Sequence, residues 1–221
     1  MAQLLDAIQI ETAPNPTTSI IWMHGLGADG NDFVPIVQEL ELPDVPIRFV
    51  FPHAPIQPVT INYGHRMRAW YDVLSSDFAE RTDKDGVRAS QQLIEALIAR
   101  EKERGSPAGR IVLAGFSQGG AMALQTGLHH AERLAGVMAL STYVPIPESL
   151  DDEDCAANRD VPVFMAHGHY DQVIPFEYAA QSRDLLAAKG YSVEWHEYPM
   201  AHSVCMEEIA HIGAWLRRVL G

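Results

Sequence analysis

One short stretch constrains this chain more than any other: residues 115–120, Gly-Phe-Ser-Gln-Gly-Gly, with Ser117 at its centre. An apolar run at 111–114 leads into it, and residues 121–125 have the composition of a buried helix. The sequence therefore predicts a strand, a sharp turn and a helix. Gly-x-Ser-x-Gly is typical of such a turn, because glycines leave room for a strained serine backbone and an exposed hydroxyl. The positive dipole end of the helix would stabilise negative charge forming there.

Composition narrows the class of protein. The chain has 221 residues, 47% of them hydrophobic, so we expect a single domain over residues 1–221. Its formal net charge of -13 disfavours nucleic acid and stable membrane association. Residues 1–6 lack the basic region and apolar core of a signal peptide, and no apolar run approaches the ~18 residues of a membrane span, so a cytoplasmic protein is expected. Cys155 and Cys205 are expected to be free thiols.

Apolar runs alternate with amphipathic segments along the chain. This alternation favours an α/β domain with a mostly parallel central sheet flanked by helices. Residues 52–71 are expected to form an ordered loop, and residues 142–160 a polar excursion, which is too short for a large cap domain. Besides the strand before Ser117 and the helix after it, strands are predicted at 4–10, 19–24, 47–51, 136–140, 161–166 and 191–198, and helices at 31–40, 83–105, 176–189 and 206–220.

A serine alcohol needs partners before it can act as a nucleophile. A base must take its proton, and the base works best when a carboxylate orients it. Ligands bind at the C-terminal ends of parallel strands, so the partners of Ser117 should follow strands. Asp171 follows the strand that ends near residue 166, and His202 lies in the loop after the strand that ends near residue 198. Ser117, Asp171 and His202 also stand in the chain order expected of an α/β-hydrolase triad.

Two further features bear on the same chemistry. Stabilising a tetrahedral oxyanion takes two N–H donors, and Gln118 and Leu26, the latter in the glycine-rich stretch 24–30, are predicted to supply them. A rival interpretation takes His167, His169 and Asp171 as a His-x-His-x-Asp metal site, although Gln172 follows where that pattern requires another histidine. A non-catalytic binding module would lack a triad member or a donor, and none is missing.

Motifs spread over nearly the whole chain resemble the carboxylesterase/phospholipase family, and in particular its bacterial carboxylesterases. The resemblance implies an α/β-hydrolase fold, a triad of Ser117, Asp171 and His202, and an oxyanion hole formed by the N–H groups of Leu26 and Gln118. The sequence departs from the family at Ala201, where a glycine is common, and at the more polar stretch 63–66. The matching stretches are 22–29, 58–62, 67–72, 114–120, 140–143, 167–175 and 213–216.

These observations lead to one functional hypothesis. We expect a serine carboxylester hydrolase that cleaves short- to medium-chain acyl esters through an acyl-enzyme and uses no metal and no cofactor. The alternative is an acyl-protein thioesterase or lysophospholipase with the same triad. The expected partner is a small-molecule ester or acyl thioester, and a homodimer is possible. A shallow, open substrate site is predicted, with apolar contacts from Ile56, Val59, Ile61, Met67, Trp70 and Tyr143.

Overall fold

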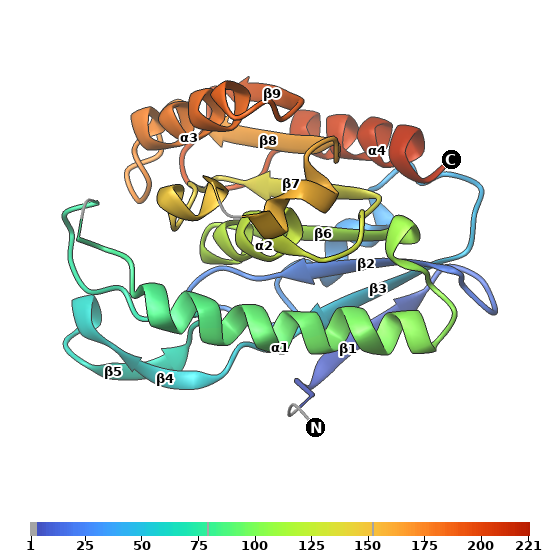
Figure 1. The fold of residues 1–221 in the computed structure, drawn as a ribbon, viewed down its shortest axis with the longest axis horizontal. Helices are drawn as coiled ribbons and strands as arrows, with labels where there is room; N and C mark the ends of the chain where they lie inside the picture. The colour runs from blue at the N-terminus through green and yellow to red at the C-terminus, as the bar shows by residue number, and fades with distance from the viewer. Residues whose placement is uncertain (1–3, 79, 152) are drawn as a thin grey trace.

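The computed structural model describes residues 4–78, 80–151 and 153–221, so the first three residues of the 1–6 segment lie outside it. The described chain forms a 7-stranded sheet in the order β1-β3-β2-β6-β7-β8-β9, in which β1 and β9 are the two edges (Figure 1). β1 pairs antiparallel with β3, and the other pairs in this sheet are parallel. The predicted mostly parallel sheet is confirmed. The bounds are β1 Ala7–Glu11, β2 Thr18–Met23, β3 Ile47–Pro52, β6 Ile111–Phe116, β7 Gly136–Leu140, β8 Val163–Gly168 and β9 Val193–Tyr198.

Both faces of the sheet are covered, which explains why its central strands are apolar without interruption. Side chains alternate between the faces, so Ile21 and Met23 of β2 pack in one core while Ile20 and Trp22 pack in the other. Helices α1 (Lys84–Glu103), α2 (Gln118–His129) and α3 (Phe176–Ala188) cover the first face. Helix α4 (Met206–Leu220) and the 3-10 helix η1 (Val34–Gln38) cover the second. These are the flanking layers of an α/β-hydrolase fold.

The start of α1 agrees with its sequence signal. Asp83 is the N-cap, and its carboxylate accepts a hydrogen bond from the N–H of Gly86 at 3.0 Å.

The predicted helix over 31–40, in contrast, is wrong: this stretch forms turns and η1. Pro35 lies at the beginning of η1, where it disfavours the α conformation of the residue before it and supplies no N–H. Phe33, Ile36 and Leu40 are still buried, so the periodic apolar residues reach the core without an α-helix.

The two long connections contain more structure than expected. Residues 52–71 include a hairpin of β4 (Ile56–Val59) and β5 (His65–Arg68), joined through the 3-10 helix η2 (Thr60–Asn62). In Figure 1 the hairpin projects at the lower left, beyond the main sheet. These strands were not predicted from the sequence because each has only four residues and Pro55 and Pro58 lie next to or within β4. Residues 142–160 include the 3-10 helices η4 (Pro147–Asp151) and η5 (Glu153–Asn158).

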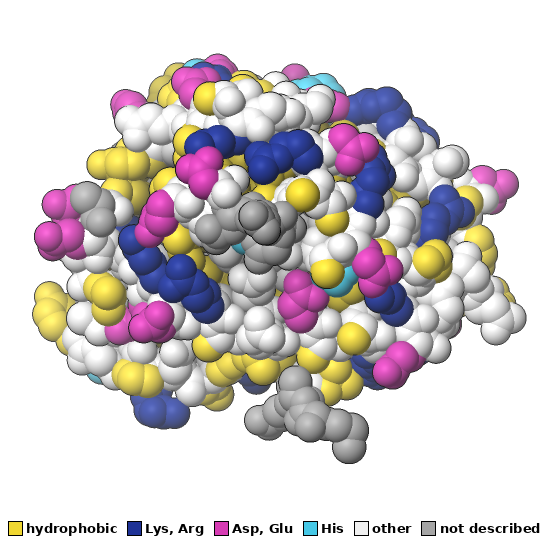
Figure 2. All heavy atoms as spheres, viewed as in Figure 1, with side chains coloured by type: hydrophobic (Ala, Val, Ile, Leu, Met, Phe, Trp, Pro, Cys, Tyr) yellow, Lys and Arg dark blue, Asp and Glu magenta, His cyan; other side chains and the backbone are white. Residues whose placement is uncertain are grey.

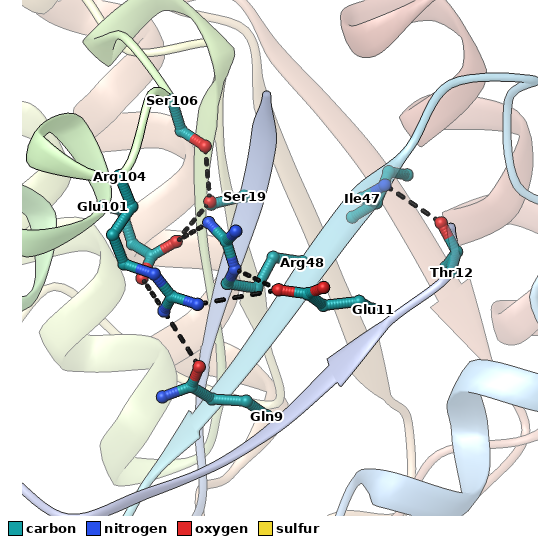
Figure 3. Close-up of polar contacts among 9 residues, drawn as sticks. All are labelled: Gln9, Glu11, Thr12, Ser19, Ile47, Arg48, Glu101, Arg104 and Ser106. Atoms are coloured by element: carbon teal, nitrogen blue, oxygen red, sulfur yellow. Dashed lines mark hydrogen bonds and ion pairs between the residues drawn. The ribbon is translucent and has the colours of Figure 1, made fainter. Parts of the chain in front are cut away.

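A buried polar network closes the sheet at the N-terminal ends of β2 and β3 (Figure 3). The Glu101 side chain of α1 is 1% exposed, and its carboxylate accepts hydrogen bonds from Ser19 Oγ at 2.6 Å and Arg48 Nη1 at 3.0 Å. Arg104 Nη1 donates to its other oxygen at 2.9 Å. Two guanidinium groups thus compensate a carboxylate that burial alone would strongly destabilise.

The surface and the helices bear on the expected partners. Figure 2 shows acidic and basic side chains interspersed over the face along which α1 runs, so neither sign forms a continuous patch in this view. Within the described chain, none of the helices combines the length and apolar character that crossing a membrane requires. Cys155 is buried, Cys205 is partly exposed, and both are free, as predicted.

Candidate active site

Ser117 lies in the turn between β6 and α2 with a backbone φ of 55° and ψ of -122°, a conformation that is strained for a residue with a side chain. The neighbouring glycines are required because a Cβ atom on Gly115 would lie 2.1 Å from the Gly119 carbonyl oxygen. The turn is held from the next strand, where the Leu140 carbonyl accepts from the Ser117 N–H at 2.8 Å. Thr142 Oγ1 donates to the Ser117 carbonyl at 2.7 Å. The strand, sharp turn and helix predicted from the sequence are present.

The structure brings the three predicted triad residues into one hydrogen-bonded chain. His202 Nε2 is 2.9 Å from Ser117 Oγ, and His202 Nδ1 is 2.6 Å from Asp171 Oδ2. An ionised carboxylate only accepts hydrogen bonds, so Nδ1 carries the proton and Nε2 is left to accept from the serine hydroxyl. Ser117 is 8% exposed and the His202 side chain 17%. The arrangement can remove a proton from Ser117 and hold it on His202.

His202 owes its position to contacts between two loops. The N–H groups of His169 and Tyr170 donate to the carbonyls of Tyr198 and Met200 at 2.9 and 3.0 Å, which ties the loop after β8 to the loop after β9. The close approach depends on Gly168, because a Cβ atom there would lie 2.3 Å from the Met200 carbonyl oxygen.

Asp171 is a buried carboxylate with four donors. Its Oδ1 accepts from the backbone N–H groups of Val173 at 2.8 Å and Ile174 at 2.9 Å. Its Oδ2 faces His202 Nδ1 at 2.6 Å and His167 Nε2 at 3.3 Å. Burial raises the pKa of Asp171, but the hydrogen bonds from His167, His202 and Ile174 outweigh it and hold that pKa well below its ordinary value. Asp171 is therefore ionised at neutral pH and can orient His202.

The two predicted oxyanion donors belong to segments that lie beside Ser117. A Cβ atom on Gly25 would lie 3.4 Å from Ser117 Cβ, so the stretch that carries Leu26 packs against the serine. Gln118 is the first residue of α2. Within the described chain, neither the Leu26 nor the Gln118 N–H has an acceptor. Both are therefore available to a substrate oxygen.

A buried clamp that the sequence did not reveal holds these segments. The Gln118 side chain accepts from the Trp70 N–H and donates to the Tyr71 carbonyl, both at 2.7 Å. Trp70 Nε1 donates to the His24 carbonyl at 2.9 Å. The His24 ring, whose pKa burial lowers, donates from Nδ1 to the Gly25 carbonyl and accepts from the Ala54 N–H at Nε2. This neutral histidine and Trp70 fix the backbone just before Leu26.

The residues predicted to contact substrate divide into two groups. Val59 is 0% exposed and Trp70 is 1% exposed, so neither offers surface to a substrate; Trp70 holds the clamp instead. Ile61 and Met67 are partly buried and pack against a small cluster of Val59, Ala69 and Val73. Ile56 is 54% exposed on the hairpin. Sequence pattern could not separate these cases because interior and lining positions are apolar alike.

Tyr143 lines a pocket of about 500 Å³. It is next in sequence to Thr142, which bonds the Ser117 backbone. The rings of Phe78 and Tyr178 stack at 3.9 Å between centroids, and Phe78 meets Tyr143 edge-on at 5.6 Å. Phe78 and Tyr178 lie far from the elbow in sequence, and no motif marked them. The apolar and aromatic lining includes Phe78, Tyr143, Val144, Pro147, Tyr178 and Leu185.

The rival metal site is not assembled. His167 is buried against Asp171 and Ile174, whereas His169 pairs with Glu197 at 3.0 Å near the surface. Among the residues that the structure describes, no three His, Cys, Asp or Glu side chains gather in an arrangement that could hold a metal ion. His167 is in β8 but His169 follows its end, so the two side chains do not keep the common face that residues two apart have within a strand.

A serine elbow at the C-terminal edge of this sheet defines the protein class as an α/β hydrolase. The Phospholipase/Carboxylesterase family model matches residues 6–220, and the chain belongs to this family. The chain is 39% identical over 216 residues to acyl-protein thioesterase 1 of Yarrowia lipolytica, covering 95% of each chain. It is 39% identical over 220 residues to acyl-protein thioesterase 1 of Neurospora crassa, covering 90% of this chain and 86% of the relative.

Solved structures agree with this assignment. Arabidopsis thaliana SOBER1 superposes with a TM-score of 0.85 at 29% identity, covering 92% of this chain and 99% of its own. Zea mays acyl-protein thioesterase 2 gives a TM-score of 0.83 at 27% identity, covering 98% of this chain and 100% of its own. The family resemblance seen in the sequence is thus confirmed. Its bacterial part is not, because the two relatives at 39% identity are fungal.

Proposed function

We propose that this protein is a serine acyl hydrolase that cleaves acyl thioesters as well as carboxylic esters, with S-acylated proteins or peptides as its main substrate class. The hydrogen-bonded chain from Ser117 through His202 to Asp171 carries the proposal. It supplies a nucleophile, a base and an orienting carboxylate in the geometry that acyl transfer requires.

The reaction follows from these contacts in two halves. His202 Nε2 takes the proton of Ser117 as Oγ attacks the acyl carbonyl, and the N–H groups of Leu26 and Gln118 stabilise the oxyanion. The imidazolium then returns its proton to the leaving thiolate or alkoxide, which departs as thiol or alcohol and leaves an acyl-Ser117 ester. A water molecule, deprotonated by His202, attacks this ester, releases the carboxylic acid and restores Ser117.

The choice between esters and thioesters rests on other observations, because the chemistry at Ser117 is the same for both. Relatives at 39% identity bear the name acyl-protein thioesterase 1, which favours the thioesterase alternative over the small-ester hypothesis. We assign the acyl chain to the pocket at Tyr143, because Tyr143 follows Thr142, which bonds the Ser117 backbone; its lining combines the aromatic side chains with polar ones such as Lys84 and Glu148. Each methylene buried there contributes ~0.8 kcal/mol, so rates should rise over the first several carbons and flatten once the pocket is filled.

A substrate panel tests the substrate class. Acyl thioesters of a small thiol, nitrophenyl esters and lysophospholipids would be compared over a series of acyl chain lengths. We expect turnover of thioesters and nitrophenyl esters at the same site, with lysophospholipids slower. Lysophospholipid cleavage that exceeds thioester cleavage at every chain length would contradict the proposed substrate class. A jump in rate where nitrophenyl esters exceed their solubility limit would contradict an open site.

Labelling with an alkyl phosphonate tests the nucleophile separately. Peptide mapping should place the label on Ser117, and the matched control Ser192→Ala, at an exposed serine, should be labelled as the wild type is. A label on any other residue would refute the assignment of Ser117.

A further inference from the structure

A second histidine, His167, contacts the carboxylate that orients His202. It is the penultimate residue of β8 and is 0% exposed. Its Nε2 lies 2.9 Å from the Ile174 carbonyl oxygen and 3.3 Å from Asp171 Oδ2. Its ring meets Phe176 edge-on with the centroids 6.2 Å apart. The reaction proposed above uses His202 but assigns no part to this residue.

The partners of His167 define where its proton lies. The Ile174 carbonyl and the ionised Asp171 both only accept, so Nε2 carries a proton that the two oxygens share. Nδ1 is buried and has no hydrogen-bond partner among the described residues. A proton there would be a buried donor without an acceptor, which is costly. His167 is therefore a neutral, single donor whose tautomer is fixed by its surroundings.

We propose that His167 is a positioning residue that holds Asp171 and lowers the basicity of His202. It bonds Ile174 O while the Ile174 N–H bonds Asp171 Oδ1, so it closes the turn that carries the carboxylate. It also shares Oδ2 with His202 Nδ1 and draws off part of the negative charge that would stabilise an imidazolium on His202. The inference rests on the proposed function for its kinetic consequences, though not for the contact itself.

The other titratable groups described near this site do not bond Asp171 and stay unchanged in the test. His169 on the loop after β8 pairs with Glu197 of β9 and stacks on Phe176. Tyr198 OH bonds His211 Nδ1 at 2.8 Å, and the buried Glu208 is on α4 beyond Cys205. Only His167 and His202 contribute side-chain hydrogen bonds to Asp171, among the residues described.

The test compares two replacements of His167. His167→Leu removes the donor, whereas His167→Gln keeps an N–H near the place of Nε2. With the donor removed, the imidazolium of His202 is better stabilised, so the acidic limb of kcat/KM should move to higher pH by about 0.5 to 1 unit in His167→Leu. kcat at pH 6 should fall more than kcat at pH 8, with KM little changed. His167→Gln should restore most of the wild-type profile, and the control His65→Gln, at an exposed histidine of β5, should match the wild type.

Nitrogen NMR of the ring-labelled wild-type protein gives a readout that needs no substrate. We expect His167 to be protonated on Nε2 alone between pH 6 and 8, and the titration of His202 to move upward in His167→Leu. A proton on His167 Nδ1, or an unshifted His202 titration in folded His167→Leu, would overturn the proposal. Should His167→Leu fail to fold, His167→Asn, whose amide is too short to reach Asp171, takes its place. If no substrate were hydrolysed, the proposed function would fail while the NMR titration still decided the role of His167.

Discussion

Two buried carboxylates, one at the N-terminal ends of the strands and one at their C-terminal ends, show how the partners of such a group decide what it can do. Glu101, at the N-terminal ends of β2 and β3, is held by the guanidinium groups of Arg48 and Arg104. Asp171, after the C-terminal end of β8, has no arginine or lysine partner among the described residues and is held by backbone N–H groups and two histidines. Arginine keeps its proton under all ordinary conditions, so the Glu101 cluster is electrically fixed. An imidazole can take up and release a proton, so the negative charge of Asp171 can stabilise a proton that His202 holds during a reaction.

The largest effect should follow from removing the serine. Ser117→Ala should lower kcat by roughly 10⁴-fold or more, because triad members act as a unit. Its Tm should stay close to that of the wild type, because the change removes one hydrogen bond to His202 and keeps the contacts of Leu140 and Thr142 with the Ser117 backbone. Kinetics and thermal unfolding on the same preparation check both points. Activity within tenfold of the wild type would rule out Ser117 as the nucleophile.

The next effect separates Asp171 from the other acidic residues. Asp171→Asn should lower kcat by roughly 10³- to 10⁴-fold, because an amide no longer stabilises the charged imidazole or fixes its tautomer. Asp160→Asn is the matched control, since Asp160 is an exposed partner of Arg133 and precedes β8. The assignment would be wrong if the Asp160 variant were the impaired one in steady-state kinetics.

At the N-terminal ends of the strands, removing the charge of Glu101 should lower the free energy of unfolding and leave kcat unchanged. Glu101→Gln removes the buried counter-charge of Arg48 and leaves it paired with the more exposed Glu11 alone, so it should cost about 2–3 kcal/mol in the free energy of unfolding. Urea unfolding measures this loss, and kcat per folded molecule should equal that of the wild type. Glu103→Gln, at an exposed position of the same helix, is the control. A large fall in kcat with unchanged stability would contradict the distinction between a stabilising carboxylate at Glu101 and a catalytic one at Asp171.

A third buried carboxylate sharpens the comparison because it has neither kind of partner. Burial raises the pKa of Glu208 from 4.5 to about 8, and the backbone N–H of Cys205 offsets only part of that shift. The group is thus protonated in the folded protein at neutral pH and ionised in the unfolded chain. The contribution of protonated Glu208 to the free energy of unfolding is therefore complete below about pH 4.5 and is lost as the pH rises through about 8.

Glu208→Gln should therefore be less pH-dependent than the wild type. The wild type should lose about 2 kcal/mol of unfolding free energy relative to this variant between roughly pH 6 and pH 7.5. Urea titrations at the two pH values measure the difference, with Glu207→Gln, an exposed neighbour, as the control. Parallel pH dependence of wild type and Glu208→Gln would mean that Glu208 is ionised when folded.

Local sequence determined the features that depend on local sterics and periodicity. The glycines around Ser117 allow the close backbone approach that a sharp turn needs, and Asp83 marks the start of α1 because its side chain bonds its own helix. The order of strands then placed Asp171 and His202 after β8 and β9, where a parallel sheet gathers its loop residues.

Tertiary structure alone decided which apolar and polar side chains face which partner. Val59 and Trp70 look like groove residues in sequence, yet packing buries both, and the Trp70 indole bonds the His24 carbonyl. The stacking of Phe78 on Tyr178 and the contact of His167 with Asp171 depend on how a loop, a helix and a strand end meet. Sequence periodicity assigns a residue to a face of its own element. What lies opposite that face is set by long-range packing, which no local pattern encodes.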